Sequence, residues 1–166
     1  GSEMCIRDSM EIKGIDKSFI TLHVGLGNFR TVDVEDLSKH KMDSEQFFVT
    51  DEAAEAVNSA KRDGHKIVAI GTTVMRTVET AVSTNGMIKP MEGWTNKFIF
   101  APYEFTVADA MVTNFHQPKS TLLLLVASFL GDDTQWRKIY AEALAGGYRF
   151  LSYGDGSLLF RLRNRH

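Results

Sequence analysis

Residues 109–125 limit the possible folds of this chain more than any other stretch. A short apolar run is followed by a polar turn over residues 114–121 and then by a helix beginning with four leucines. Because that helix is apolar on every side, it must lie in a core. Pro118 and the Ser120-Thr121 pair are typical of a helix start. In parallel α/β sheets, ligands bind at such strand-to-helix turns, so we predict that this turn forms one wall of a site.

A second strand-turn-helix unit lies earlier in the chain. Residues 65–70 form an apolar run typical of a buried parallel strand. The preceding helix is expected to begin after a Thr50 cap and to end at Gly64. Residues 71–73 then lead into a helix over 74–82. This alternation indicates an α/β fold, and we expect residues 17–162 to form one such domain.

The remaining segments are assigned from periodicity and from turn residues. Alternation predicts a strand over 17–24, and strands are also expected over 148–153 and 157–162. Residues 83–97, which contain Gly, Asn and Pro, are expected to form a connection. We expect residues 1–16 to be a disordered or cloning-derived leader, and residues 163–166 to be a basic tail.

Two further turns are candidates for ligand binding. In residues 25–30, Gly25 and Gly27 permit a sharp turn, but Arg30 occupies the third glycine position of a dinucleotide fingerprint. A plain glycine turn and a ligand-touching loop therefore remain equal alternatives. At residues 71–76, backbone N–H groups and hydroxyls at a helix start could hold an anion. The alternative is that Thr73 only caps the helix and Arg76 pairs with Glu79.

Composition excludes several classes of protein. A net charge of −2 and a pI near 6.2 provide no general attraction for nucleic acid. Cys5 is the single cysteine, which excludes an internal disulfide framework and suits the cytoplasm. No apolar run approaches the roughly 20 residues of a membrane span, so no membrane association is expected. A metal site at His40, Asp43 and Glu45 is an alternative to a solvated loop, and we expect no metal.

Several segments together resemble one family, the S-adenosylmethionine:tRNA ribosyltransferase-isomerases of queuosine biosynthesis. They follow the family's order from about residue 19 to residue 159, and they are residues 22–30, 42–45, 71–73 with Arg76 and Glu79, 112–116, 118–122, 148–150 and 152–155. The resemblance covers only the family's C-terminal half. Asp43 stands where the family usually has histidine.

The resemblance implies a fold, a reaction and partners. The expected fold is a Rossmann-like, mixed but largely parallel sheet with flanking helices, in an incomplete domain that lacks the family's inserted β-barrel. The implied reaction transfers and isomerises the ribosyl group of S-adenosylmethionine, as substrate, onto 7-aminomethyl-7-deazaguanine in tRNA, giving epoxyqueuosine. The implied partners are tRNA with a modified wobble guanine, the missing N-terminal half, or a second copy.

The resemblance also assigns roles to residues. Proton transfer is expected from His116, His23 or Glu45, because histidine is best poised near neutral pH. Substrate binding is expected from residues of the three turns and from one later carboxylate, namely Gly25, Gly27, Phe29, Arg30, Gly71, Thr72, Thr73, Arg76, Asn114, Phe115, Ser120, Thr121 and Asp155. Two other functions remain open: an inactive binding or accessory module of the same fold, and an unrelated nucleotide-binding α/β protein.

Overall fold

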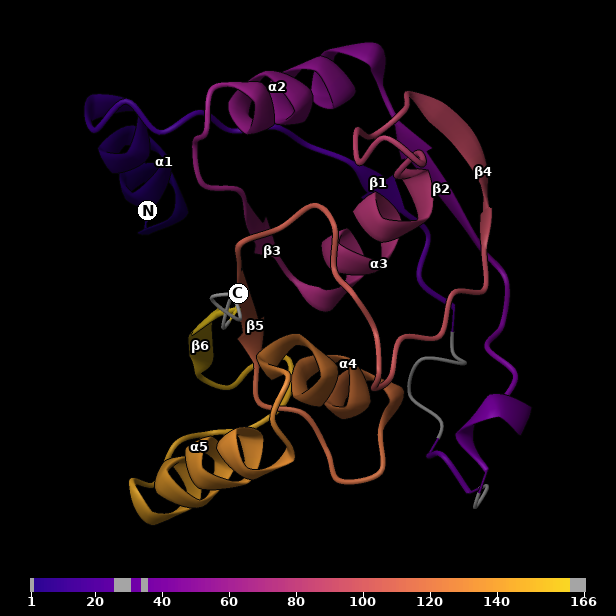
Figure 1. Cartoon of the computed structure of the whole chain (residues 1–166). Helices are drawn as coiled ribbons and strands as arrows, with labels where there is room; N and C mark the ends of the chain where they lie inside the picture. Colours follow the sequence, from indigo (N-terminus) through magenta and orange to yellow (C-terminus); the bar gives the residue numbers. More distant parts are fainter. Residues whose placement is uncertain (1, 26–30, 34–35, 162–166) are drawn as a thin grey trace.

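The structure, a computed structural model, describes residues 2–25, 31–33 and 36–161. These residues form a mixed α/β fold with two three-stranded sheets (Figure 1). The helices are α1 (Ser2–Ile12), α2 (Asp51–Arg62), α3 (Thr72–Ala81), α4 (Thr121–Leu130), α5 (Asp133–Ala145) and the short 3-10 helix η2 (Leu37–Lys39). The strands are β1 (Thr21–Leu22), β2 (Glu45–Val49), β3 (Val68–Ile70), β4 (Met91–Thr95), β5 (Ala110–Asn114) and β6 (Gly156–Phe160).

The two sheets differ in strand direction. The first has the order β1-β2-β4 and is antiparallel throughout. The second has the order β3-β5-β6, in which β3 and β5 are parallel and β6 is antiparallel to β5. The α/β prediction is confirmed, but the expectation of a largely parallel sheet is wrong for the described strands. Two helices rather than one separate β5 from β6, so the chain returns in the opposite direction.

Local capping chemistry fixes the helix starts. The Thr50 hydroxyl accepts a hydrogen bond from the Ala53 N–H at 3.1 Å and caps α2. The Ser120 hydroxyl accepts from the Leu123 N–H at 3.1 Å and caps α4. Helix α4 ends at Gly131, which has a left-handed φ of 70° that glycine adopts without strain. Both predicted starts are confirmed.

Helix α3 lies between two hydrophobic cores. Its Met75 packs into a core formed by one face of the β3-β5-β6 sheet and the buried side of α4. Its Val78 and Ala81 pack into a second core with β2 and α2. The apolar helix predicted after residue 120 is buried as expected, through Leu125, Val126, Phe129 and Leu130. Helix α3 is therefore the element that joins the two sheets.

Three predicted segments are corrected by the structure. The strand expected over 17–24 is paired only at Thr21–Leu22, and the connection expected over 83–97 contains β4. Residues 148–150 have no regular structure and residues 151–153 form a bend and a turn, where a strand is predicted. Gly154 closes this turn, because a Cβ on it would lie 2.3 Å from the Arg149 carbonyl oxygen.

The start of the chain also differs from the expectation. Residues 2–12, predicted to belong to a disordered or cloning-derived leader, form α1. Within the described ranges, no helix has the length and apolar character needed to cross a membrane.

Candidate functional site

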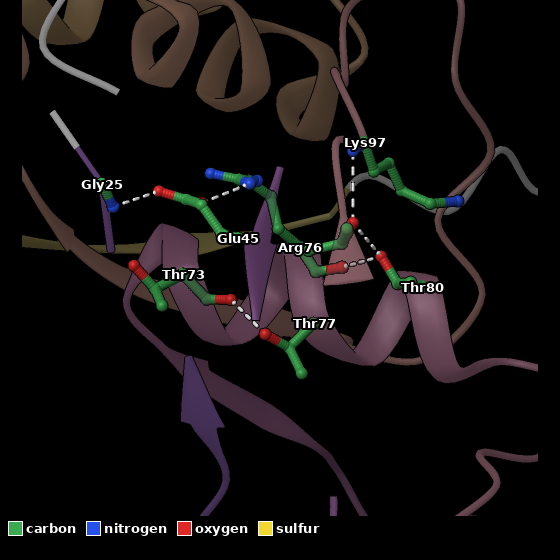
Figure 2. Close-up of polar contacts among 8 residues, drawn as sticks. Gly25, Glu45, Thr73, Arg76, Thr77, Thr80 and Lys97 are labelled. Atoms are coloured by element: carbon green, nitrogen blue, oxygen red, sulfur yellow. Dashed lines mark hydrogen bonds and ion pairs between the residues drawn. The ribbon is translucent and has the colours of Figure 1, made fainter. Parts of the chain in front are cut away.

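A buried ion pair lies where α3 meets the β1-β2-β4 sheet. Arg76 Nη2 of α3 is 2.6 Å from Glu45 Oε2 at the start of β2, and both side chains are 3% exposed. The other carboxylate oxygen, Oε1, accepts a hydrogen bond from the Gly25 N–H at 2.7 Å. Figure 2 shows this chain of contacts from Gly25 through Glu45 to Arg76. The structure thus brings together three residues predicted for the site from three separate segments.

Hydroxyl groups continue this network along α3. The Thr80 hydroxyl donates to the Arg76 carbonyl at 2.8 Å and lies 2.8 Å from the Thr95 hydroxyl of β4 (Figure 2). The Lys97 N–H donates to the same Thr95 oxygen. One turn earlier, the Thr77 hydroxyl donates to the Thr73 carbonyl. Helix α3 is therefore fixed to β4 at the same turn that carries Arg76.

Both flanks of the glycine turn at residues 25–30 are anchored. Gly25 is held by Glu45, and Thr31 forms a bridge with Ser120 just before α4. The Val32 N–H also donates to the Lys119 carbonyl at 2.8 Å. The Glu45–Arg76 pair therefore lies beside Gly25, before this turn, and the start of α4 lies beside Thr31 and Val32, after it. The predicted site residues Gly27, Phe29 and Arg30 lie outside the described residues.

The turn after β3 is held against β5. The Gly71 N–H donates to the Val112 carbonyl at 2.7 Å, and Gly71 caps α3 with a φ of 100° and no side-chain hydrogen bond. Thr72 is buried and Thr73 is half-buried in the first turn of the helix. The sheet thus places this turn beside the end of β5, as the predicted parallel pairing requires.

For the turn at residues 71–76, the alternative that Thr73 caps the helix and Arg76 pairs with Glu79 is wrong in both parts. Thr73 does not cap α3, because Gly71 occupies the cap position. Arg76 pairs with Glu45 rather than with Glu79. Glu79 is fully buried and accepts hydrogen bonds from the N–H groups of Thr106 and Val107 and from the Tyr103 hydroxyl. Burial and the Glu79 charge raise the pKa of Tyr103 well above its ordinary value, so this hydroxyl stays protonated.

The polar turn after β5 contacts the turn before β6. The Asn114 side-chain amide donates to the carbonyls of Gly154 and Asp155 at 3.4 and 3.3 Å. Asp155 accepts from the Arg149 N–H at 2.7 Å, and this hydrogen bond together with the Arg149 charge lowers the pKa of the Asp155 carboxyl. Two predicted binding residues, Asn114 and Asp155, therefore belong to one structural unit.

Phe115 has a packing role in this unit. Its ring lies 5.3–5.8 Å from the rings of Tyr140, Tyr148 and Phe150. Its carbonyl accepts from the Leu151 N–H at 2.9 Å. This aromatic cluster holds the turns of residues 148–155 against the end of β5. Predicted as a substrate-binding residue, Phe115 is buried among these rings.

His116 is buried, and its surroundings do not suit the predicted role in proton transfer. Its Nε2 lies 2.9 Å from the Thr113 hydroxyl, and its backbone N–H donates to the Tyr140 hydroxyl at 2.9 Å. Burial lowers the pKa of His116 from 6.5 to about 4. An efficient base near neutral pH needs a pKa close to 7. At this lowered pKa His116 is neutral near pH 7, and its role in proton transfer stays a prediction.

The other predicted residues lie at the edges of this region. His23 is exposed beyond β1, where its ring meets the edge of Phe48 at 5.7 Å. Ser120 serves as the α4 cap, and the buried Thr121 hydroxyl has no hydrogen-bond partner within the described ranges. His40 contacts the Phe98 ring. Among the residues that the structure describes, no three His, Cys, Asp or Glu side chains are grouped as metal ligands would be.

Sequence reasoning missed three residues that shape the site. Thr113 and Tyr140 hold His116, and Thr95 joins β4 to α3. Thr113 directly precedes the predicted turn, so its position was a usable signal. Nothing in the sequence placed Tyr140 or Thr95 near the other site residues, since both contacts depend on packing between elements.

Comparisons with known proteins identify relatives along almost the whole chain. A family model described as queuosine biosynthesis protein matches residues 3–159. An S-adenosylmethionine:tRNA ribosyltransferase-isomerase of Bacteroides fragilis is 64% identical over 150 residues, which are 90% of this chain and 42% of the relative. The protein of the same name from Symbiobacterium thermophilum is 49% identical over 152 residues, or 92% of this chain and 44% of the relative.

A solved structure agrees with these matches. The crystal structure of S-adenosylmethionine tRNA ribosyltransferase from Thermotoga maritima superposes with a TM-score of 0.72 at 35% identity. The superposition covers 92% of this chain and 48% of that protein. The chain therefore spans less than half the length of each of these three relatives.

Proposed function

The chain belongs to the queuosine biosynthesis protein family, and from this premise we propose that it is one part of an S-adenosylmethionine:tRNA ribosyltransferase-isomerase. The proposed reaction moves the ribosyl group of S-adenosylmethionine onto 7-aminomethyl-7-deazaguanine in tRNA and isomerises it, giving epoxyqueuosine. The observation that carries this proposal is the 64% identity with the Bacteroides fragilis protein over 90% of the chain. The rest of the enzyme, S-adenosylmethionine and tRNA are the proposed partners, and the cytoplasm is the proposed location.

The contacts support different roles for the different site residues. Both carboxylate oxygens of Glu45 bind groups of the chain itself, so Glu45 and Arg76 act as positioning residues for the Gly25 turn. The same contacts do not suit Glu45 as an acid or base, or Arg76 as a clamp for a substrate carboxylate. The start of α3 is the proposed anion-binding group, because Gly71 leaves the first backbone N–H groups of the helix without a side-chain cap.

The opposite wall of the proposed site is the turn after β5. Asn114 is held by the segment that ends in Asp155, and the ionised Asp155 can accept hydrogen bonds from ribose hydroxyls. Ser120 and Thr121 lie at the start of α4, beside the strand bridge to Thr31. His116 is neutral at pH 7, and its role in this wall is structural. Of the predicted histidines, the exposed His23 remains the better candidate for proton transfer.

Adenine release tests the proposal. The chain is incubated with S-adenosylmethionine and with tRNA that carries the aminomethyl-deazaguanine, either alone or together with the part of the Bacteroides fragilis relative that it does not span. Adenine is measured by chromatography, and the tRNA nucleosides are measured by mass spectrometry. We expect adenine and epoxyqueuosine only in the combined sample, and not with tRNA that lacks the modified base. Absence of both products from the combined sample would refute the proposal.

A second candidate is a binding or accessory module of the same fold without chemistry, which needs one wall of a site but not the full geometry that a transition state requires. This candidate predicts that the chain binds S-adenosylmethionine in calorimetry and that the combined sample releases no adenine.

A further inference from the structure

A polar hollow lies at the edge of the β3-β5-β6 sheet that is opposite to the candidate site. Ile67 precedes β3, Asp109 precedes β5 and Arg161 follows the antiparallel β6, so these three residues lie at one edge of the sheet. Together with Lys61 from the last turn of α2, they line a cavity of about 270 Å³. A water molecule occupies about 30 Å³ in the liquid, so the cavity has room for a small ionic group.

The side chains around this cavity are mainly cationic. Lys61, Lys66 and Arg161 carry positive charges, His65 adds an imidazole, and Asp109 is the one carboxylate among the described residues that line it. We call these five residues the basic hollow. Because the whole chain has a net charge of −2, this concentration of cations is a local feature.

Contacts within the chain fix two of the cations in place. The Lys61 ammonium donates to the carbonyls of Gly86 and Thr106 at 2.6 and 2.8 Å, which leaves the third of its three donors. The Arg161 guanidinium has one hydrogen bond within the described residues, from Nη1 to the Phe105 carbonyl. A guanidinium carries five N–H donors, so most of the donors of Arg161 can bind a ligand.

Asp109 offsets only one of the three positive charges. Its Oδ2 accepts a hydrogen bond from the Ile67 N–H at 3.1 Å, and its Oδ1 lies 3.7 Å from Lys66 Nζ, which is beyond hydrogen-bond distance. The Lys66 side chain is 71% exposed. The Asp109 carboxylate therefore holds the start of β3, and the Lys66 ammonium can turn toward an anion.

The macrodipole of α2 explains only one of these cations. The partial negative charge at the end of a helix favours a basic residue in its last turn, and this accounts for Lys61. Lys66 and Arg161 lie outside the helices, and positive charges that converge repel each other unless an anion lies between them. The guanidinium fork of arginine matches phosphate oxygens, and lysine adds a compact charge.

We propose that the basic hollow binds a phosphate group, and that this phosphate belongs to the backbone of an RNA. The RNA assignment rests on the proposed function, since a chain without a general attraction for nucleic acid needs a local basic surface to bind tRNA. Strand β3, which separates the hollow from the Gly71 turn, has three residues, or about 10 Å at 3.3 Å per residue. A stretch of RNA backbone can span this distance, so one molecule can contact both the hollow and the candidate site.

Binding of an RNA hairpin tests the proposal without catalysis. A fluorescently labelled anticodon stem and loop, with guanine at the wobble position, is titrated with the chain, and anisotropy is measured between about 50 and 200 mM salt. Lys66→Gln and Arg161→Gln should each weaken binding at least about fivefold. Each should also reduce the slope of log K against log salt concentration by about 1.

Arg62→Gln is the matched control. Arg62 follows Lys61 directly in α2, pairs with Glu55 and does not line the hollow. The control removes the same charge, so a general electrostatic effect would weaken RNA binding as much as Lys66→Gln does. We expect a change of less than about twofold and an unaltered salt slope. Circular dichroism checks that the variants are folded, which is expected for Lys66→Gln because that side chain is exposed.

A free phosphate ion is the competing source of the same chemistry. Backbone amide chemical shifts of residues 64–67 are recorded while inorganic phosphate is added, with chloride at equal ionic strength as the reference. Saturable shifts that both variants abolish, together with their loss of RNA affinity, support the proposal. If the variants abolish these shifts but keep full RNA affinity, the RNA assignment is overturned.

Two other outcomes also decide against the proposal or separate it from the proposed function. Unchanged RNA binding by folded Lys66→Gln and Arg161→Gln, or an equal loss in Arg62→Gln, would overturn the basic hollow as an RNA site. RNA binding through the hollow without adenine release in the combined sample would support the hollow and refute only the proposed function.

Discussion

At the scale of single residues, the Glu45–Arg76 pair dominates the energetics of the candidate site. Removing one partner leaves the other charge buried, which costs about 3–5 kcal/mol in proteins. We therefore expect Arg76→Ala to lower the free energy of unfolding by about 3 kcal/mol or more. Glu45→Gln leaves the Arg76 charge buried and offers one acceptor oxygen to two donors, so it should cost a similar amount, and the double variant should cost less than the sum of the two. Urea unfolding followed by circular dichroism measures all three.

The chain offers an exposed ion pair as a control. Arg62 pairs with Glu55 on the outer side of α2, with both side chains at least half exposed. Exposed pairs contribute about 0–1 kcal/mol, so Arg62→Ala should change stability by less than 1 kcal/mol. Equal losses for Arg76→Ala and Arg62→Ala would show that the buried pair does not hold the site together.

His116 gives the chain a predictable response to acid. Its pKa is about 4 in the folded state, against an ordinary 6.5. Above pH 6.5 the residue is neutral in both states. Between pH 6.5 and 4 the unfolded state binds the proton more tightly, so stability falls as the pH is lowered, by up to about 3 kcal/mol.

A glutamine in place of His116 removes this contribution and keeps a polar group beside Thr113. We expect the difference in unfolding free energy between the unmodified chain and His116→Gln to shrink as the pH falls from 6.5 to 4. Urea unfolding at several pH values measures it. A difference that stays constant across this window would mean that His116 is not buried as a neutral imidazole.

At the scale of elements, the turn of residues 148–155 depends on one glycine. A Cβ at Gly154 would lie 2.3 Å from the Arg149 carbonyl oxygen, whereas a Cβ at Gly156 would meet only the Thr113 carbonyl at 3.8 Å. Gly154→Ala must shift the backbone, and we expect a cost of about 1–3 kcal/mol. Gly156→Ala should cost less than 1 kcal/mol. Thermal unfolding compares them, and similar midpoints would show that the turn does not depend on Gly154.

Elements whose signals are local could be predicted from the sequence. The starts of α2 and α4 follow from the side chains of Thr50 and Ser120, which bond to N–H groups three residues later. The buried character of α4 follows from its leucines. The two predicted turns, residues 71–76 and 114–121, follow strands that pair in parallel. The Gly71–Val112 hydrogen bond links them, because parallel strands end at the same edge.

Features that depend on contacts between distant segments could not be predicted. Glu45 and Arg76 are separated by 31 positions, and the sequence predicts proton transfer for the first and substrate binding for the second, but not their contact. Strand β4 has little apolar alternation and is stabilised by its pairing with β2. A strand is predicted over residues 148–153, but the ring contacts of Phe115 and the close backbone approach at Gly154 hold this segment in an irregular turn.

At the scale of the whole molecule, the exposed apolar side chains of the β3-β5-β6 sheet, Val68, Ile70, Leu158 and Phe160, should govern association. At high concentration the isolated chain should self-associate, because burying this apolar surface is favourable at about 25 cal/mol per Å². Ile70→Glu should weaken that association, and Trp94→Glu, which lies on β4 of the other sheet, should not. Light scattering over a concentration series measures it. A chain that stays monomeric at all concentrations, with a sharp thermal transition, would contradict this expectation.

The most direct measurement is a titration of adenine release. A fixed amount of the chain, S-adenosylmethionine and the aminomethyl-deazaguanine tRNA receives increasing amounts of the Bacteroides fragilis region that the chain does not span. If the chain is one part of a ribosyltransferase-isomerase, adenine release should rise from background and saturate near an equimolar ratio. Release that stays at background at every ratio, or that is equally fast without the chain, would contradict this function.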